Sequence, residues 1–108
     1  MRDKFSQKEL VFYKLYTAYR EDKERWLPTW EFVGEILVKE TGKWALMSYK
    51  TPTNGLKIFF DNPGLIERRW KRGRSGATYY EYRIAPLPTE AKILDEKLLK
   101  FYRKIKKA

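Results

Sequence analysis

The sequence predicts an α+β fold in which three helices and a short strand precede a two-stranded hairpin, with a further helix at the end of the chain. Two patterns lead to this expectation. Apolar residues recur every three or four positions in four segments, which is the spacing of helices that bury one face. From Thr78 to Ile84 the residues alternate between two sides instead, which is the period of a strand. The length of 108 residues, 43% of them hydrophobic, suits one domain with a modest core.

The first helix has the clearest start signal. Ser6 and Glu9 have the spacing of a capping box, in which the hydroxyl and the carboxylate each satisfy a free backbone amide. The helix is expected to end near Arg20, and the charged residues 21–25 predict a loop. The apolar residues of its predicted buried stripe are Phe12, Leu15, Tyr16 and Tyr19.

A short extended piece and a second helix follow. The residue before a proline avoids the helical region, so residues 26–28 are expected to be extended. Thr29 is the expected cap of the second helix, and Thr41 and Gly42 are expected to end it. The predicted apolar face consists of Trp30, Val33, Ile36 and Leu37. Residues 44–47 leave two possibilities open, a short helix or a buried turn.

The third helix is expected to begin at Thr51 and Pro52, because a capping hydroxyl followed by proline is a common helix start. Residues 61–64 are expected to end it. Its predicted buried face consists of Leu56, Phe59 and Phe60. Its predicted exposed face carries Thr53, Asn54 and Lys57.

Two strands, Leu65 to Lys71 and Thr78 to Ile84, are expected to form a hairpin around the glycine-containing loop 72–77. The expected hairpin has a net charge of +4 between Glu67 and Arg74. Its five cations are Arg68, Arg69, Lys71, Arg72 and Arg74. Such a tip cannot be part of a core, and it predicts contact with a polyanion. Tyr79 and Tyr80 could stack on bases, although the alternation favours packing within the hairpin.

The end of the chain predicts a stiff linker at residues 85–88 and a fourth helix, capped by Thr89, that runs nearly to Ala108. Its apolar residues form a heptad-like seam of Leu94, Leu98, Phe101 and Ile105. Something must cover this seam. It either packs on the first helix or pairs with its counterpart in a homodimer, and we expect the homodimer.

The net charge of +10 is unevenly distributed along the chain. Residues 1–40 are neutral, so residues 41–108 carry the whole excess. A basic half beside a neutral half is typical of a protein that binds nucleic acid. A generally basic protein from a hot environment would share this composition.

The composition also indicates what the protein does not do. The sequence has no cysteine, so it has no thiolate metal ligand. It also has no histidine, which is the commonest metal ligand and the commonest general base in proteins. We therefore expect no metal, no other cofactor and no enzymatic activity. No apolar run approaches the ~20 residues of a membrane span, and Met1 to Phe5 lack the apolar region of a signal peptide. These observations predict a soluble cytoplasmic protein without a membrane partner.

The order of the expected elements resembles the winged helix-turn-helix domain of DNA-binding transcription regulators. The residues Pro63-Gly64-Leu65-Ile66-Glu67-Arg68-Arg69 are similar to the end of a recognition helix and the first strand of a wing. The residues Trp26-Leu27-Pro28-Thr29-Trp30-Glu31 are similar to the passage from strand to helix in small archaeal, phage and viral members. The resemblance implies a winged domain in residues 1–84 and an extension in residues 85–108.

The resemblance implies a sequence-specific protein that binds double-stranded DNA and regulates transcription. The third helix would enter the major groove, and the basic wing would contact the minor groove or the backbone. The implied DNA-binding residues are Lys50, Thr51, Thr53, Asn54, Lys57, Arg68, Arg69, Lys71, Arg72, Arg74 and Ser75. The amide of Asn54 could pair with adenine, and Lys57 could bind guanine.

Residues 43–50 make the connection between the second and third helices longer than that of a tight helix-turn-helix. Either they form an extra turn of structure, or the recognition element begins before Thr51. Two other functions remain open from the sequence. The protein could be a winged-helix adaptor for other proteins, or a module that binds RNA or single strands.

Overall fold

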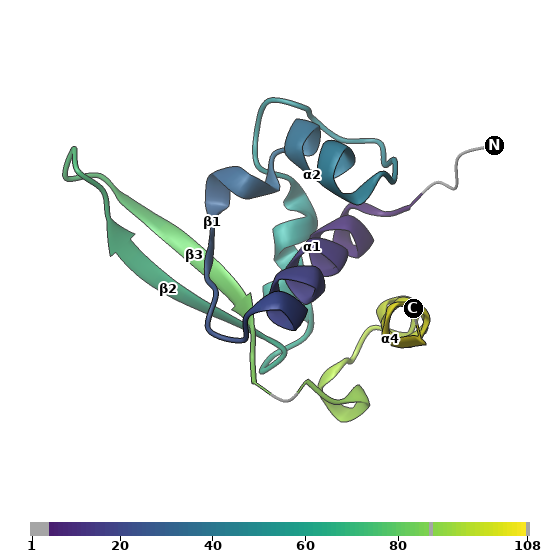
Figure 1. The fold of residues 1–108 in the computed structure, drawn as a ribbon. Coiled ribbons are helices and arrows are strands. Elements are labelled where there is room, and N and C mark those ends of the chain that lie inside the picture. Colours follow the sequence, from purple (N-terminus) through teal and green to yellow (C-terminus); the bar gives the residue numbers. More distant parts are fainter. Residues whose placement is uncertain (1–4, 87, 108) are drawn as a thin grey trace.

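The computed structural model describes residues 5–86 and 88–107, and within them it has four α-helices and one three-stranded antiparallel sheet (Figure 1). The α+β class predicted from the sequence is confirmed. Residues 1–4, 87 and 108, which belong to the expected N-terminal region, linker and last helix, lie outside the described residues. In chain order the elements are α1 (Gln7–Glu21), β1 (Leu27–Pro28), the 3₁₀ turn η1 (Thr29–Phe32), α2 (Gly34–Thr41), η2 (Asn54–Lys57), α3 (Ile58–Asp61), β2 (Ile66–Arg72), β3 (Thr78–Ile84), η3 (Glu90–Lys92) and α4 (Glu96–Lys107).

Helix α1 lies at the centre of the core. The expected capping box is present, since the Glu9 amide donates to Ser6 Oγ (3.2 Å) and the Ser6 amide donates to the Glu9 carboxylate (3.0 Å). Leu10, Val11 and Phe12 are all fully buried. Consecutive helical residues point about 100° apart, so α1 must be covered on several sides. Contacts from α2, η2, β3 and α4 supply this cover.

The expected second helix is divided into two parts. Val33 is extended (φ −70°, ψ 147°) and separates η1 from α2, so Thr29 does not cap one continuous helix. The break also changes which residues are buried. Phe32 and Leu37 are fully buried, whereas Trp30, which was expected in the apolar face, is 53% exposed.

Residues 43–50, all of them described, contain no helix. Ala45 is buried and Leu46 is exposed, so this segment is a partly buried turn. The Glu35 amide donates to the carbonyl of Tyr49 (3.2 Å), which holds the segment against the start of α2. No earlier recognition helix begins in residues 43–50.

The third helical segment begins at Asn54, and its cap is Thr53 rather than Thr51. The Thr53 hydroxyl oxygen accepts a hydrogen bond from the amide two residues later (3.2 Å). Pro52 forms an isolated β-bridge with Val33, so it is held in an extended conformation and cannot start the helix.

The 3₁₀ turn η2 packs directly on α1 at Gly55. A Cβ atom at Gly55 would lie 2.6 Å from the Gln7 carbonyl oxygen, so no larger residue fits here without a shift of the backbone. Because a 3₁₀ turn has fewer residues per turn than an α-helix, it changes which later residues point inward. Ile58 is fully buried, whereas Phe60 is 63% exposed, contrary to the sequence prediction.

The strands β2 and β3 form a hairpin that projects away from the helices (Figure 1). Their pairing runs from Ile66 with Ile84 to Arg72 with Thr78. Strand β3 has the predicted bounds, and β2 lies one residue later than predicted. The two-residue strand β1 pairs with the other edge of β3, which gives the order β1-β3-β2.

Helix α4 follows η3 and does not start at Thr89. Its first turn is instead capped by the carboxylate of Asp95, which accepts hydrogen bonds from the amides of Lys97 (3.0 Å) and Leu98 (3.3 Å). The same carboxylate pairs with Lys8 of α1 (3.3 Å). Burial opposes ionisation of Asp95, but the Leu98, Lys8 and Lys97 bonds outweigh it and lower the pKa of this group.

The apolar seam of α4 packs on α1 within the same chain. Leu98, Phe101 and Ile105 are buried, and the Phe101 ring meets the Phe12 ring edge to face at 6.2 Å. Leu94 is 65% exposed and lies outside this contact. Three of the four residues named for dimerisation, Leu98, Phe101 and Ile105, are therefore buried in the protein's own core, and the homodimer stays a prediction. Helix α4 thus contributes to the same hydrophobic core as α1.

We expect Leu98→Ala to lower the free energy of unfolding by about 2–5 kcal/mol, because it removes a buried side chain from the α1–α4 contact. Leu94→Ala is the matched control and should change it by less than about 0.5 kcal/mol. Urea denaturation measures both values. Similar effects for the two variants would contradict the packing of α4 on α1.

Candidate functional site

The hairpin has two chemically different faces. Successive strand residues point to opposite sides, and the residues paired across β2 and β3 share a side. One face is buried in the protein core at the end of the hairpin nearest the helices, and we call it the core-side face. It carries Ile66, Arg68, Trp70, Arg72, Thr78, Tyr80, Tyr82 and Ile84. The opposite face, here called the outer face, carries Glu67, Arg69, Lys71, Tyr79, Glu81 and Arg83.

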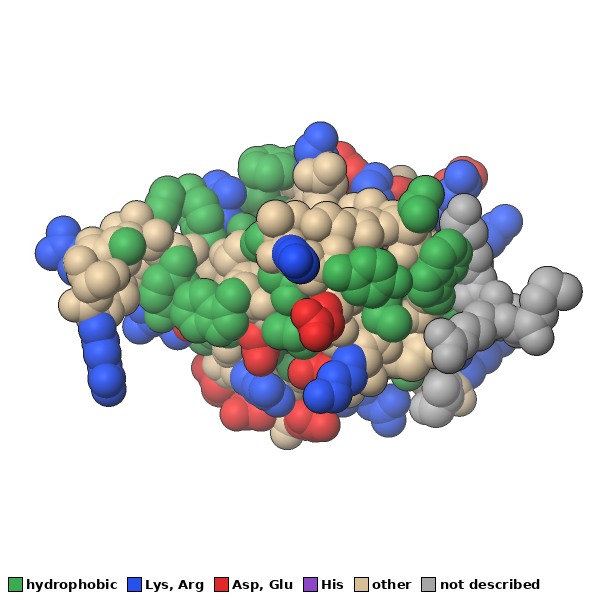
Figure 2. All heavy atoms as spheres, turned by 90° about the horizontal axis from the view of Figure 1, so that it is seen from above, with side chains coloured by type: hydrophobic (Ala, Val, Ile, Leu, Met, Phe, Trp, Pro, Cys, Tyr) green, Lys and Arg blue, Asp and Glu red, His purple; other side chains and the backbone are tan. Residues whose placement is uncertain are grey.

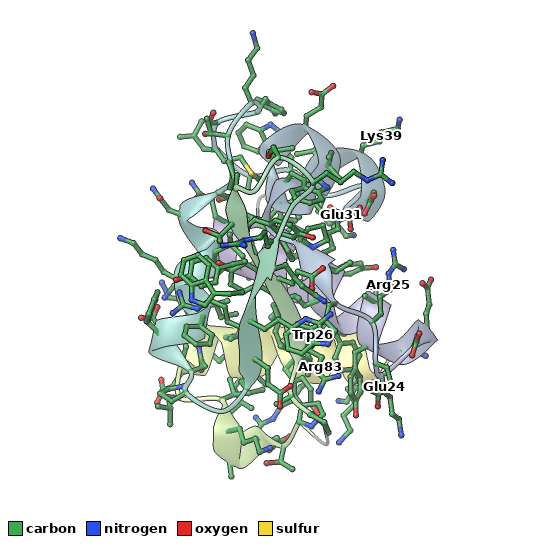
Figure 3. All side chains as sticks on the ribbon, turned by 90° about the vertical axis from the view of Figure 1, so that its left-hand side faces the viewer. Glu24, Arg25, Trp26, Glu31, Lys39 and Arg83 are labelled. Carbon is green, nitrogen blue, oxygen red and sulfur yellow. The ribbon has the colours of Figure 1, made fainter. Side chains whose placement is uncertain are left out.

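The outer face is largely charge-paired. Its ion pairs are Arg69–Glu81 (2.8 Å), Arg83–Glu67 (2.7 Å) and Arg83–Glu24 (3.3 Å). The guanidinium groups of Arg69 and Arg83 also lie over the Trp26 ring, 4.2 and 4.5 Å from its centroid. Figure 3 shows Glu24, Trp26 and Arg83 together over the base of the hairpin. Arg69, predicted to bind DNA, is therefore engaged with groups of its own chain.

The core-side face is joined to α3 by Arg68. The centre of its guanidinium lies 4.1 Å from the ring centroid of Tyr80 on β3. The same group lies 4.6 Å from Phe59 and 5.4 Å from Phe60, both on α3. A planar cation between aromatic rings is attracted to each of them. Arg68 therefore connects the base of the hairpin with the third helical segment.

Trp70 lies on the core-side face and is 61% exposed. Its ring centroid is 3.7 Å from that of Tyr80, its cross-strand neighbour. Trp70 is not among the site residues predicted from the sequence. The signal was present, since Arg68, Trp70 and Arg72 are two positions apart and must share one face of a strand.

An exposed row on η2 and α3 leads to this face. Asn54, Lys57 and Phe60 are spaced by three, and side chains with this spacing align in a 3₁₀ turn. All three are exposed. Thr53 is not part of the row, because it is buried and its hydroxyl donates to the side-chain oxygen of Gln7. The prediction that Thr53 lies on the exposed face is wrong.

The tip of the hairpin is the most accessible basic part of this surface. Lys71, Arg72, Arg74 and Ser75 are exposed, and within the described residues none of the three cations forms an ion pair. Figure 2 shows basic and hydrophobic side chains around the projecting hairpin, while acidic side chains gather along another edge of the molecule. The exposed residues Lys50 and Thr51 lie in the connection that precedes η2.

The basic excess of residues 41–108 does not form one continuous surface. Figure 1 shows the hairpin tip and α4 at opposite ends of a molecule whose longest dimension is 41 Å. Lys97, Lys100 and Lys104 are exposed on α4, far from the tip. The positive charge of residues 41–108 is therefore divided between two separate parts of the surface, the hairpin tip and α4.

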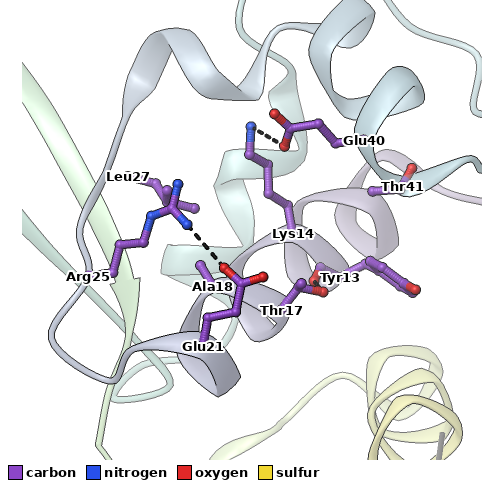
Figure 4. Close-up of a pocket in the computed structure, with 9 residues that line it drawn as sticks. All are labelled: Tyr13, Lys14, Thr17, Ala18, Glu21, Arg25, Leu27, Glu40 and Thr41. Atoms are coloured by element: carbon purple, nitrogen blue, oxygen red, sulfur yellow. Dashed lines mark hydrogen bonds and ion pairs between the residues drawn. The ribbon is translucent and has the colours of Figure 1, made fainter.

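A pocket of about 320 Å³ lies between α1, α2 and the start of β1 (Figure 4). Lys14 at its wall is buried, donates to the carbonyl of Glu31 and pairs with Glu40 (3.1 Å). Arg25 pairs with Glu21 (3.2 Å). The charged residues named here thus pair with one another within the chain.

Comparison of the chain with family models, with curated proteins and with solved structures gives no match. Over residues 5–86 and 88–107, no group of three or more Asp or Glu side chains is placed to hold a metal ion. In the same part of the chain, no helix has the length and apolar character needed to cross a membrane.

The role of Arg68 gives a stability prediction. Arg68→Ala should lower the free energy of unfolding by about 1–2 kcal/mol, because it removes a cation held between aromatic rings and its packed stem. Arg72→Ala, on the same strand and face but exposed, is the control and should cost less than about 0.5 kcal/mol. Thermal or urea unfolding compares them, and equal losses would show that Arg68 does not join α3 to the hairpin.

Proposed function

We propose that this protein binds duplex DNA in a sequence-dependent manner as a winged helix-turn-helix domain, the kind of module that transcription regulators use. The element order and the sheet order β1-β3-β2 are compatible with that fold. The observation that carries the proposal is the continuity of one surface. The exposed row of Asn54, Lys57 and Phe60 meets the core-side face of the hairpin at Arg68.

The hairpin tip and the row on η2 and α3 would contact different parts of the DNA. The cations of the hairpin tip would bind phosphates, and the release of counterions from the DNA would supply affinity without sequence preference. Asn54 and Lys57 lie on a helical segment beside the hairpin and can form hydrogen bonds to base edges. The segment from Asn54 to Asp61 is short, so we expect it to read only a few base pairs.

The proposal predicts a strong dependence of affinity on salt. If Lys50, Lys71, Arg72 and Arg74 neutralise about four phosphates, the slope of log affinity against log salt should be about −3.6. Replacing both Arg72 and Arg74 by alanine should weaken binding to all duplexes and make the slope shallower by about 2. Fluorescence anisotropy at several salt concentrations measures both effects.

The matched control replaces Lys97 and Lys100 by alanine, which removes the same charge from the opposite end of the molecule. This variant should keep nearly the full slope. Equal changes in the two double variants would mean that overall charge, and not the hairpin, determines binding. Binding that does not respond to salt would contradict the proposal and favour a protein-interaction role.

The reading of bases is tested separately. Selection from a random duplex library should enrich a motif, and Asn54→Ala should then cost ~1–3 kcal/mol on the enriched site and little on random DNA. Because Asn54 is exposed, its replacement should leave the melting temperature nearly unchanged. An equal loss on both kinds of DNA would show that Asn54 does not read sequence.

A further inference from the structure

Exposed aromatic residues occur on both faces of the hairpin. On the core-side face, Trp70 is 61% exposed and its ring lies on Tyr80. On the outer face, Trp30 is 53% exposed and its ring centroid lies 4.8 Å from that of Tyr79. The two faces therefore present similar aromatic pairs, and exposure alone does not distinguish them.

The charges around the two pairs are different. Trp70 is flanked on its own strand by Arg68 and Arg72, each about 7 Å away along the same face. Three carboxylates form the ion pairs of the outer face: those of Glu67 and Glu81 on the hairpin and that of Glu24, which precedes β1. Glu81 lies two positions from Tyr79 along β3, and the cross-strand neighbour of Tyr79 is Lys71. The core-side positions of β2 and β3 carry no carboxylate. A ligand with flat apolar groups on an anionic chain would therefore prefer Trp70, and this combination describes a nucleic-acid strand.

The bases of an intact duplex cannot use such a site, because their faces are covered by the neighbouring base pairs. Away from the ends of a duplex, a base exposes a face that an indole ring can stack on only when it is unpaired, either in a single-stranded segment or turned out of the helix. Tyr80 supports the Trp70 ring from within the hairpin, so the indole is held in place before the ligand arrives.

We infer that Trp70, supported by Tyr80 and flanked by Arg68 and Arg72, is a stacking site for an unpaired base. The preferred ligand is then a duplex that continues into a single strand, with the double-stranded part on the η2–α3 row and the unpaired part on the core-side face. The inference rests on the proposed binding of duplex DNA and adds a ligand class to it.

The test measures the affinity of three probes at fixed salt by fluorescence anisotropy: a blunt duplex, the same duplex with a single-stranded tail, and the tail strand alone. The wild-type protein should bind the tailed duplex about tenfold more tightly than the blunt one. Trp70→Ala should abolish that preference and leave the affinity for the blunt duplex within about twofold of the wild type. Trp70→Phe keeps a ring and should retain most of the preference.

Trp30→Ala is the matched control, because it removes a similarly exposed indole that packs on the outer face. It should leave the tail preference intact. Equal affinity of the wild type for blunt and tailed duplexes would overturn the inference. So would an equal effect of Trp70→Ala on both probes, which would make Trp70 a general duplex contact, or a loss of preference in Trp30→Ala.

A second measurement does not depend on removing Trp70. In a variant with Trp26, Trp30 and Trp44 replaced by phenylalanine, the remaining fluorescence comes from Trp70. The tailed duplex should quench it, and the blunt duplex should not, whereas equal quenching would overturn the inference. A failure of the proposed duplex binding gives a different result from a failure of this inference. The single tail strand would then bind as tightly as the tailed duplex.

Discussion

The burial of α1 on several sides determines where the other elements lie. Leu10, Val11 and Phe12 are consecutive and fully buried, so no single layer could cover them. The seam of α4, the turn η2, helix α2 and strand β3 each cover a different side. A small protein without disulfides depends on such a shared core, and a change on any side of α1 affects elements that are far apart in sequence.

The candidate surface follows from this arrangement. Gly55 brings η2 into direct contact with α1, which fixes the direction of the row that begins at Asn54. Arg68 then attaches the base of the hairpin to the end of that row. The two parts of the surface are therefore held in place by packing before any ligand binds, and this lowers the entropic cost of recognition.

Local signals in the sequence predicted the local features correctly. The capping box of α1, the bounds of β3 and the end of α2 at Gly42 all depend on neighbouring residues. The errors concern contacts between distant segments. The β-bridge between Val33 and Pro52 divides the predicted second helix and moves the start of the third helical segment to a later residue. No local sequence pattern indicates this bridge.

Two residues of the predicted site have partners within the chain that the sequence did not reveal, for the same physical reason. Thr53 looks like an exposed polar residue until Gln7, from another helix, binds its hydroxyl. Arg69 looks like a free cation until Glu81 is placed opposite it across the hairpin. The seam of α4 shows that a buried face exists, but periodicity cannot say whether α1 or a second molecule covers it.

The short length of β1 has a consequence for how molecules of this protein meet in solution. It pairs with β3 only at Tyr82 and Glu81, so the outer half of the hairpin is a ribbon with open edges in the described structure. Open strand edges can pair with those of other chains, and clustered Lys and Arg side chains oppose such pairing. Lys71, Arg72 and Arg74 lie at that end. The charge of the tip thus protects the protein against aggregation, independently of any ligand that it binds.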